Sequence, residues 1–217
     1  MLIKVSGLCS PENIADVVKL GVDMAGFVFS KGDPRRVGMI PSLAGIIPDY
    51  ADRRMLSEGF FPKRVGIFKD DMPQSIVTAV YNYRLDYVQL DGDESPVMID
   101  NLRRSLVPDI VSGISIIKKV SMSATDTFGE SARFSGYADM LLFDTDDMQQ
   151  ADISVFESYS GNLPFLIGGR MVACGAGQFR NMRNPMFAGV DLDNGFEVSP
   201  GIKDMEKLRS YIASLKA

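Results

Sequence analysis

Along the whole chain, short apolar runs alternate with longer stretches in which apolar residues recur at helical spacing. The short runs predict eight strands, four in each half of the chain. These are Leu2–Val5, Met24–Phe29, Lys63–Phe68, Tyr87–Leu90, Ile114–Val120, Met140–Phe143, Pro164–Ile167 and Ala188–Leu192. The stretches between them predict helices, for example from the spacing of Ile76, Val77, Val80 and Tyr81.

Proline and serine mark the expected helix starts. Ser10-Pro11 and Ser95-Pro96 place a capping hydroxyl before a proline at the first helical position. Pro41 and Pro73 mark similar starts after the second and third strands. Near-continuous apolar strands such as Gly26-Phe27-Val28-Phe29 are typical of a parallel sheet that helices cover.

The order of these elements predicts the fold class. Eight strand–helix units predict an α/β protein with a (βα)8 TIM barrel, at about 27 residues per unit. Because the chain has no linker, charge block or low-complexity run, residues 1–217 are expected to form a single domain. An open doubly wound sheet is the alternative, but no glycine-rich dinucleotide turn follows the first strand. The sixth unit is expected to be shortened, since few residues separate Asp144 from Pro164.

The composition excludes several kinds of site. The chain has no histidine, which excludes histidine triads and histidine metal sites. Proton transfer must therefore use carboxylates, lysine, tyrosine or cysteine. The two cysteines, Cys9 and Cys174, belong to no paired motif, so reduced thiols are expected. A net charge of −5 without a basic stripe argues against nucleic acid as a partner.

The hydropathy of the chain bears on its location. No apolar run approaches the roughly 20 residues that a membrane helix requires, so no membrane partner is expected. The first residues, Met1–Gly7, reach a turn too early for a signal peptide. The expected location is therefore the cytoplasm.

Short motifs follow the predicted strands, where the chemistry of a TIM barrel is found. They are Lys4-Val5-Ser6-Gly7, Gly26-Phe27-Val28-Phe29, Asp33-Pro34-Arg35, Val88-Gln89-Leu90-Asp91-Gly92, Leu141-Leu142-Phe143-Asp144-Thr145, Gly168-Gly169, Gly189-Val190-Asp191-Leu192-Asp193 and Pro200-Gly201-Ile202-Lys203-Asp204. In order and spacing, this series resembles the motifs of phosphoribosylanthranilate isomerases, and it covers nearly all of the chain.

The resemblance implies an isomerase of tryptophan biosynthesis that acts on a small phosphosugar, N-(5-phosphoribosyl)anthranilate. The implied reaction is an Amadori rearrangement to a 1-deoxyribulose 5-phosphate product, without cofactor or metal. The resemblance assigns Asp144 as the general acid and Arg35 as the residue that holds the anthranilate carboxylate. The alternatives are a helix cap or loop carboxylate for Asp144 and a solvated charge for Arg35. Arg36 is expected to be a solvated charge.

The phosphate region that the resemblance implies comprises Gly168, Gly169, Arg170, Asn194 and Gly195. Backbone amides and a guanidinium group at this turn suit a phosphate. Two changes oppose it, because each adds negative charge. Thr145-Asp146-Asp147-Met148 replaces the family's glycine loop after the sixth strand, and Asp193-Asn194 replaces its serine pair.

The base of the family is a cysteine after the first strand, and this chain has Ser6 there. An unassisted serine hydroxyl is a very poor base at neutral pH. Lys4 should point to the same face as Ser6 and could assist it, and Cys9 is a nearby alternative. Asp91 replaces the family's usual histidine. It is either a substitute base or the cap of the next helix.

Two functions remain open from the sequence. The first is a working isomerase with Asp144 as acid and an unusual base. The second is a catalytically impaired or inactive paralogue that binds a phosphorylated or aromatic carboxylate ligand. A ribulose-phosphate epimerase is disfavoured, because that chemistry relies on histidine metal ligands. Both a monomer and a homodimer are compatible with the sequence.

Overall fold

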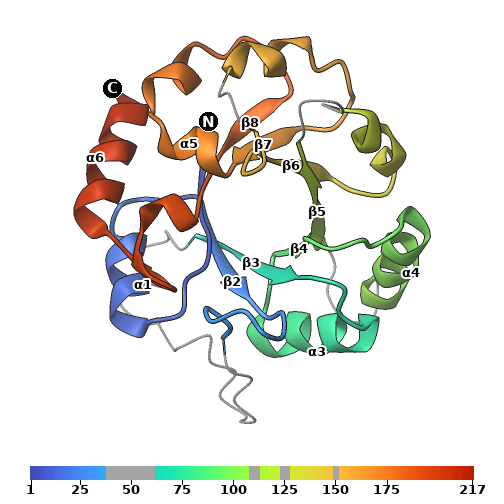
Figure 1. Cartoon of the computed structure of the whole chain (residues 1–217). Coiled ribbons are helices and arrows are strands. Elements are labelled where there is room, and N and C mark those ends of the chain that lie inside the picture. The colour runs from blue at the N-terminus through green and yellow to red at the C-terminus, as the bar shows by residue number, and fades with distance from the viewer. Residues whose placement is uncertain (38–61, 108–112, 123–127, 149–151) are drawn as a thin grey trace.

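A computed structural model describes residues 1–37, 62–107, 113–122, 128–148 and 152–217 of the chain. Eight parallel strands close into a barrel in chain order, and helices surround it (Figure 1). The strands are β1 (Leu2–Val5), β2 (Met24–Val28), β3 (Lys63–Phe68), β4 (Tyr87–Leu90), β5 (Ser115–Ser121), β6 (Met140–Asp144), β7 (Phe165–Gly168) and β8 (Phe187–Leu192). The predicted (βα)8 barrel is confirmed, and strand ends differ from those predicted by no more than one residue.

The longer helices are α1 (Pro11–Val18), α3 (Pro73–Tyr83), α4 (Pro96–Leu106) and α6 (Met205–Lys216). As predicted, Ser10 and Ser95 cap the helices that begin at the following prolines. Pro41 lies outside the described residues. The helix predicted from the spacing of Ile76, Val80 and Tyr81 is confirmed as α3, although the side chain of Tyr81 is 70% exposed. The buried face follows the i, i+3, i+4, i+7 spacing of Ile76, Ala79, Val80 and Tyr83.

The remaining units have shorter elements. They are the 3-10 helices η1 (Gly129–Phe134), η2 (Ile153–Ser158), η3 (Gly177–Asn181) and η4 (Asn194–Phe196), the one-turn helix α5 (Arg170–Ala173), and the hairpin β9 (Glu197–Ser199) and β10 (Ile202–Lys203). In the described part of the sixth unit, only η2 lies between β6 and β7, which agrees with the predicted shortening. Aromatic rings pack here, with the Phe165 centroid 5.3 Å from Phe143 and 5.9 Å from Phe156.

The hydrophobic core has two parts because successive strand residues point to opposite faces. The larger part joins the outer faces of the strands to the helices. The smaller part comes entirely from strands and fills the barrel interior with Met24, Val28, Val65, Ile67, Ile117, Met140, Leu142 and Leu166. Polar side chains follow these residues toward the carboxyl ends of the strands, so the apolar interior forms the floor of a polar site.

The pair β1–β8 closes the barrel and aligns Lys4 with Asp191. Residues paired in this way point to the same face of a sheet. Two opposite charges that are far apart in the sequence therefore meet inside the barrel. Of the helices in the described ranges, none combines the length and apolar character needed to cross a bilayer.

Candidate active site

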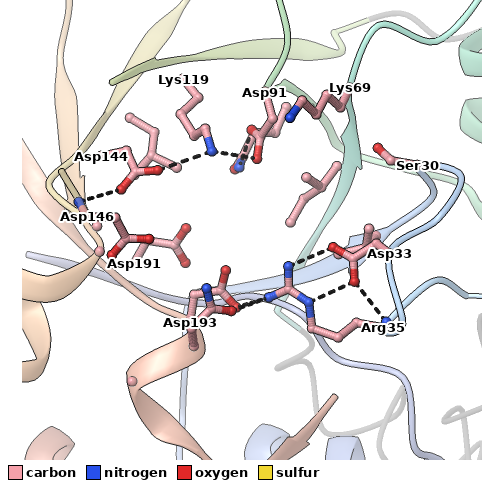
Figure 2. Close-up of a pocket in the computed structure, with 18 of the residues that line it drawn as sticks. Ser30, Asp33, Arg35, Lys69, Asp91, Lys119, Asp144, Asp146, Asp191 and Asp193 are labelled. Atoms are coloured by element: carbon pink, nitrogen blue, oxygen red, sulfur yellow. Dashed lines mark hydrogen bonds and ion pairs between the residues drawn. The ribbon is translucent and has the colours of Figure 1, made fainter. Parts of the chain in front are cut away.

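A cavity of about 780 Å³ lies at the carboxyl ends of the strands. Figure 2 shows charged side chains from several strand ends directed toward this space. The polar residues that line it include Ser30, Asp33, Arg35, Lys69, Asp91, Lys119, Asp144, Asp146, Asp191 and Asp193. The two residues central to the sequence prediction, Arg35 and Asp144, therefore share one cavity.

Asp144 is the last residue of β6 and points into the cavity (Figure 2). Its Oδ1 accepts a hydrogen bond from the backbone amide of Asp146 at 3.0 Å. Its Oδ2 lies 3.1 Å from the ammonium group of Lys119. One carboxylate oxygen thus stabilises the turn after β6, while the other is held by a cation in the cavity.

Lys119 lies near the end of β5 and bridges two carboxylates. Its Nζ is 3.1 Å from Asp144 Oδ2 and 3.5 Å from Asp91 Oδ2. Burial lowers the pKa of this ammonium group, but the two aspartates outweigh burial and raise the pKa to about 12. Lys119 is therefore a cation throughout the neutral range.

Asp91 follows β4 and accepts a hydrogen bond from Gln89 Nε2 at 2.8 Å. Burial raises the pKa of this carboxyl group, although Lys119 and Gln89 act in the opposite direction. The interpretation of Asp91 as a helix cap is wrong, because Ser95 Oγ accepts the amide of Met98 at the start of α4. Asp91 instead belongs to the cavity wall, as a substitute base would.

Ser6 is buried beside the cavity in contact with Lys4 and Asp191. The Lys4 ammonium donates to Ser6 Oγ, and Ser6 Oγ donates to Asp191 Oδ1 at 2.7 Å. Lys4 Nζ also pairs with Asp191 Oδ2 at 2.7 Å. The prediction that Lys4 and Ser6 share a face is confirmed. Lys4, however, donates hydrogen bonds to both Ser6 and Asp191, so it is placed as a hydrogen-bond donor to Ser6 and not as a base.

The space around Ser6 is tightly limited. A β-carbon at Gly26 on the neighbouring strand β2 would lie 2.8 Å from Ser6 Oγ. Cys9 lies elsewhere, since its Sγ donates to the carbonyl of Gly201 at 3.6 Å and it is not among the cavity-lining residues. Burial also raises the pKa of this thiol. Its position therefore argues against Cys9 as a replacement base.

Arg35 lines the cavity, but its guanidinium group already has partners in the protein (Figure 2). Asp33 binds it in a bidentate manner, with Nε and Nη2 at 3.0 and 2.8 Å from the two carboxylate oxygens. Nη1 donates to Asp193 at 2.8 Å and to Asn194 at 2.6 Å. A ligand carboxylate must compete with these internal acceptors. Arg36, as predicted, is exposed to solvent.

The predicted phosphate region is brought together on one side of the cavity. Gly168, Gly169, Arg170, Asn194 and Gly195 all line it. Gly169 has a φ of +82°, and a β-carbon there would lie 2.6 Å from a carboxylate oxygen of Asp144. The turn therefore needs glycine both for its backbone conformation and for this close approach.

An internal carboxylate also occupies part of this region. The side chain of Asp146 accepts a hydrogen bond from the backbone amide of Arg170, at the start of α5. Burial and the neighbouring Asp144 raise the pKa of Asp146. A carboxyl group therefore lies against an amide of the predicted phosphate turn.

Several site residues were not predicted to have a role. Lys119 and Asp191 line the cavity, and Asp33 and Lys203 join Asp193, which the sequence had indicated only as an added negative charge, in the network around Arg35. The alternation of strand residues was the available signal, since it places Lys119 two residues after the buried Ile117 on the interior face. Among the described residues, no group of three or more cysteine, aspartate or glutamate side chains is arranged to hold a metal ion.

A protein-family match and two similar proteins indicate the same family. Residues 3–214 match the family described as N-(5'phosphoribosyl)anthranilate (PRA) isomerase. The N-(5'-phosphoribosyl)anthranilate isomerase of Parabacteroides distasonis is 34% identical over 221 residues, which cover 99% of this chain and 93% of that protein. The one from Phocaeicola vulgatus is 26% identical, with coverage of 100% and 98%.

Solved structures show the same fold. The phosphoribosyl anthranilate isomerase of Thermotoga maritima superposes with a TM-score of 0.76 at 23% identity, covering 100% of this chain and 98% of its own. Another phosphoribosyl anthranilate isomerase, in complex with reduced 1-(o-carboxyphenylamino)-1-deoxyribulose 5-phosphate, superposes with a TM-score of 0.74 at 22% identity. It has the same coverage.

Proposed function

Because the chain belongs to the phosphoribosylanthranilate isomerase family, we propose that it rearranges N-(5-phosphoribosyl)anthranilate to the 1-deoxyribulose 5-phosphate product in tryptophan biosynthesis. The observation that carries this proposal is the shared cavity of Asp144, Arg35 and the Gly168–Gly169 turn. An acid, a carboxylate-binding group and a phosphate-binding turn are the groups that this substrate requires.

The proposed reaction begins with proton transfer from Asp144 to the furanose oxygen. The ring then opens to a Schiff base, and loss of the proton on C2 gives an enolamine that becomes the ketone. Asp144 supplies this proton from the end of β6, where its Oδ2 lies 3.1 Å from the ammonium group of Lys119.

The two ends of the substrate have separate anchors in this proposal. Arg35 binds the anthranilate carboxylate after exchanging one of its internal partners, and Arg170 with the glycine turn binds the phosphate. Gln89 adds a third contact point, since it lines the cavity and its buried Oε1 has no hydrogen-bond partner in the described residues. This oxygen is available to accept a hydrogen bond from a sugar hydroxyl.

The proposal is tested by measuring conversion of phosphoribosylanthranilate by the wild type and by Asp144→Asn. The variant should lose about 100-fold or more in kcat, which is the usual contribution of general acid catalysis. Asp147→Asn is the matched control, because Asp147 is exposed and does not line the cavity. It should leave kcat within about twofold of the wild type.

Two results would contradict the proposed activity. One is the absence of product from the wild type at high enzyme concentration, and the other is an equal effect of the two substitutions. If the wild type forms no product but binds the reduced product analogue in calorimetry, the non-catalytic alternative replaces the isomerase.

A further inference from the structure

Asp191 is in direct contact with the residue at the family's base position. Its Oδ1 accepts the hydroxyl proton of Ser6 at 2.7 Å, and its Oδ2 pairs with Lys4 Nζ at 2.7 Å. Asp191 lines the cavity, whereas Ser6 and Lys4 are not among the lining residues. A carboxylate oxygen therefore lies one hydrogen bond from the position of the missing thiol, on the side that a ligand reaches.

The surroundings of Asp191 suit a proton acceptor. Its side chain is only 5% exposed, so the carboxylate is largely withdrawn from water. Burial raises the pKa of this group, and the Lys4 ammonium acts against burial to favour the charged form. A buried carboxylate with a raised pKa is a stronger base than an ordinary aspartate. Each oxygen also keeps a lone pair beyond the bond that it makes to Ser6 or Lys4.

The other candidates are less well placed. Ser6 already donates its only hydroxyl proton to Asp191, so its action as a base would also depend on that carboxylate. Lys4 is the cation of a buried ion pair. Asp91 shares Lys119 with Asp144, which places it on the acid side of the cavity (Figure 2). Asp191 lies on β8 and contacts the base position itself.

We propose that Asp191 takes the proton from C2 of the substrate in place of the family's cysteine. Ser6 and Lys4 are then positioning residues that orient the carboxylate through its two oxygens. This inference rests on the proposed function, because it assigns a role within that reaction. It also explains how the cavity keeps a base although the thiol at position 6 has become a hydroxyl.

The proton balance of the cycle is complete with two aspartates. After Asp144 protonates the ring oxygen, the C2–H bond of the Schiff base breaks and the proton passes to Asp191. The electron pair of that bond forms the C1–C2 double bond, and the imine electrons return to nitrogen. In the enolamine, the 2-hydroxyl proton then passes to Asp144 while Asp191 returns its proton to C1. The ketone forms, and both aspartates regain their starting states.

The test compares kcat and KM for phosphoribosylanthranilate in four proteins: wild type, Asp191→Asn, Ser6→Ala and Asp91→Asn. Asp191→Asn should lower kcat by about 100-fold or more, as expected for loss of a general base. Ser6→Ala removes one orienting hydrogen bond, and Asp91→Asn removes a carboxylate that the step does not use. Each should lower kcat by less than about tenfold.

The pH profile gives a readout that a purely structural role would not change. In the wild type, kcat/KM should fall on the acid side as the base becomes protonated, and Ser6→Ala should keep this fall. If Asp191→Asn does not fold, as judged from its thermal melting, the pH profile of kcat/KM for Ser6→Ala tests the role of Asp191 instead. A retained acid-side fall supports Asp191, and an inactive but folded Ser6→Ala overturns it.

Failure of the inference can be told apart from failure of the proposed function. A wild type that turns over substrate, together with an Asp191→Asn variant within tenfold of it, overturns the role of Asp191 alone. If Asp91→Asn loses more kcat than Asp191→Asn, then Asp91 and not Asp191 is the base. A wild type without turnover removes the isomerase activity, and the inference with it.

Discussion

At the scale of single residues, internal carboxylates occupy the groups of this site that could bind an anionic ligand. Asp33 and Asp193 hold the guanidinium of Arg35, and Asp146 accepts the amide of Arg170. A substrate with two anionic ends must displace or neutralise these groups. We therefore expect weak substrate binding, which appears in KM more than in kcat.

Asp193→Ser tests this expectation at one of these internal carboxylates. The substitution frees Nη1 of Arg35 from its 2.8 Å ion pair and removes a negative charge from the cavity. Lys203 keeps its partner Glu197, at 2.7 Å. We expect KM for phosphoribosylanthranilate to fall about fivefold in steady-state kinetics, since partly exposed pairs contribute about 1 kcal/mol. The kcat value should stay close to that of the wild type.

The control for this experiment is Asp16→Ser, which removes an aspartate that pairs with Lys19 on the exposed surface of α1. Its KM should be unchanged. A rise in KM for Asp193→Ser would mean that Asp193 positions Arg35 for the substrate and does not compete with it.

Sequence motifs predicted the site residues that stand in motifs, but not those whose role depends on strand pairing. Asp144, Arg35 and Gly168–Gly169 stand in motifs, and the barrel brings them to one cavity. The roles of Lys119 and Asp191 depend on which face each strand residue takes and on pairing between distant strands. Lys118 and Lys119 are adjacent, yet Lys118 pairs with buried Glu94 while only Lys119 reaches the cavity.

At the scale of elements, the strands were the easiest to predict and the later helices the hardest. Each strand is a distinct apolar run, so the strand is predicted correctly even where its first or last residue is misplaced by one position. After β5 and β6, by contrast, the described residues form the 3-10 helices η1 and η2. The apolar spacing in these two segments does not show that they form 3-10 helices whose aromatic side chains pack on the barrel.

The capping of α4 gives an element-scale prediction. Ser95 Oγ accepts the amide of Met98 at 3.2 Å, so Ser95→Ala should lower the free energy of unfolding by about 1 kcal/mol. Urea denaturation followed by circular dichroism measures this change. Ser105→Ala makes the same chemical change inside the same helix, where Ser105 is exposed and alanine favours the helix.

Ser105→Ala should therefore be neutral or slightly stabilising. An equal loss in both variants would indicate that the Ser95 hydroxyl does not stabilise the helix as a cap.

At the scale of the whole molecule, the barrel combines an apolar floor with a charged upper interior. Met24, Val65 and Leu166 belong to the lower cluster. Above it lie the buried Lys4–Asp191 pair and the Lys119 bridge. Charges withdrawn from water cost stability unless they are paired, so their effect on folding must depend on pH.

Asp91 and Asp33 should give opposite pH dependences of stability. Burial raises the pKa of Asp91, so the unfolded chain loses this proton at a lower pH than the folded protein does. Stability from Asp91 is present below the ordinary carboxyl range and is lost as the pH rises through the folded pKa. Asp91→Asn lacks this loss, and Lys119 still keeps Asp144 as a partner. Relative to wild type, the variant should gain stability as the pH rises above the ordinary carboxyl range.

For Asp33 the sign is reversed. The hydrogen bonds from Arg35 lower the pKa of this carboxyl group, so its stabilisation is present at neutral pH and is lost as the pH falls through the folded value. Asp33→Asn should therefore lose stability relative to wild type at neutral pH, and the difference should shrink in acid. Urea denaturation of the three proteins across the same pH series measures both slopes. Slopes of the same sign would show that the two aspartates do not differ in their electrostatic environment as the structure indicates.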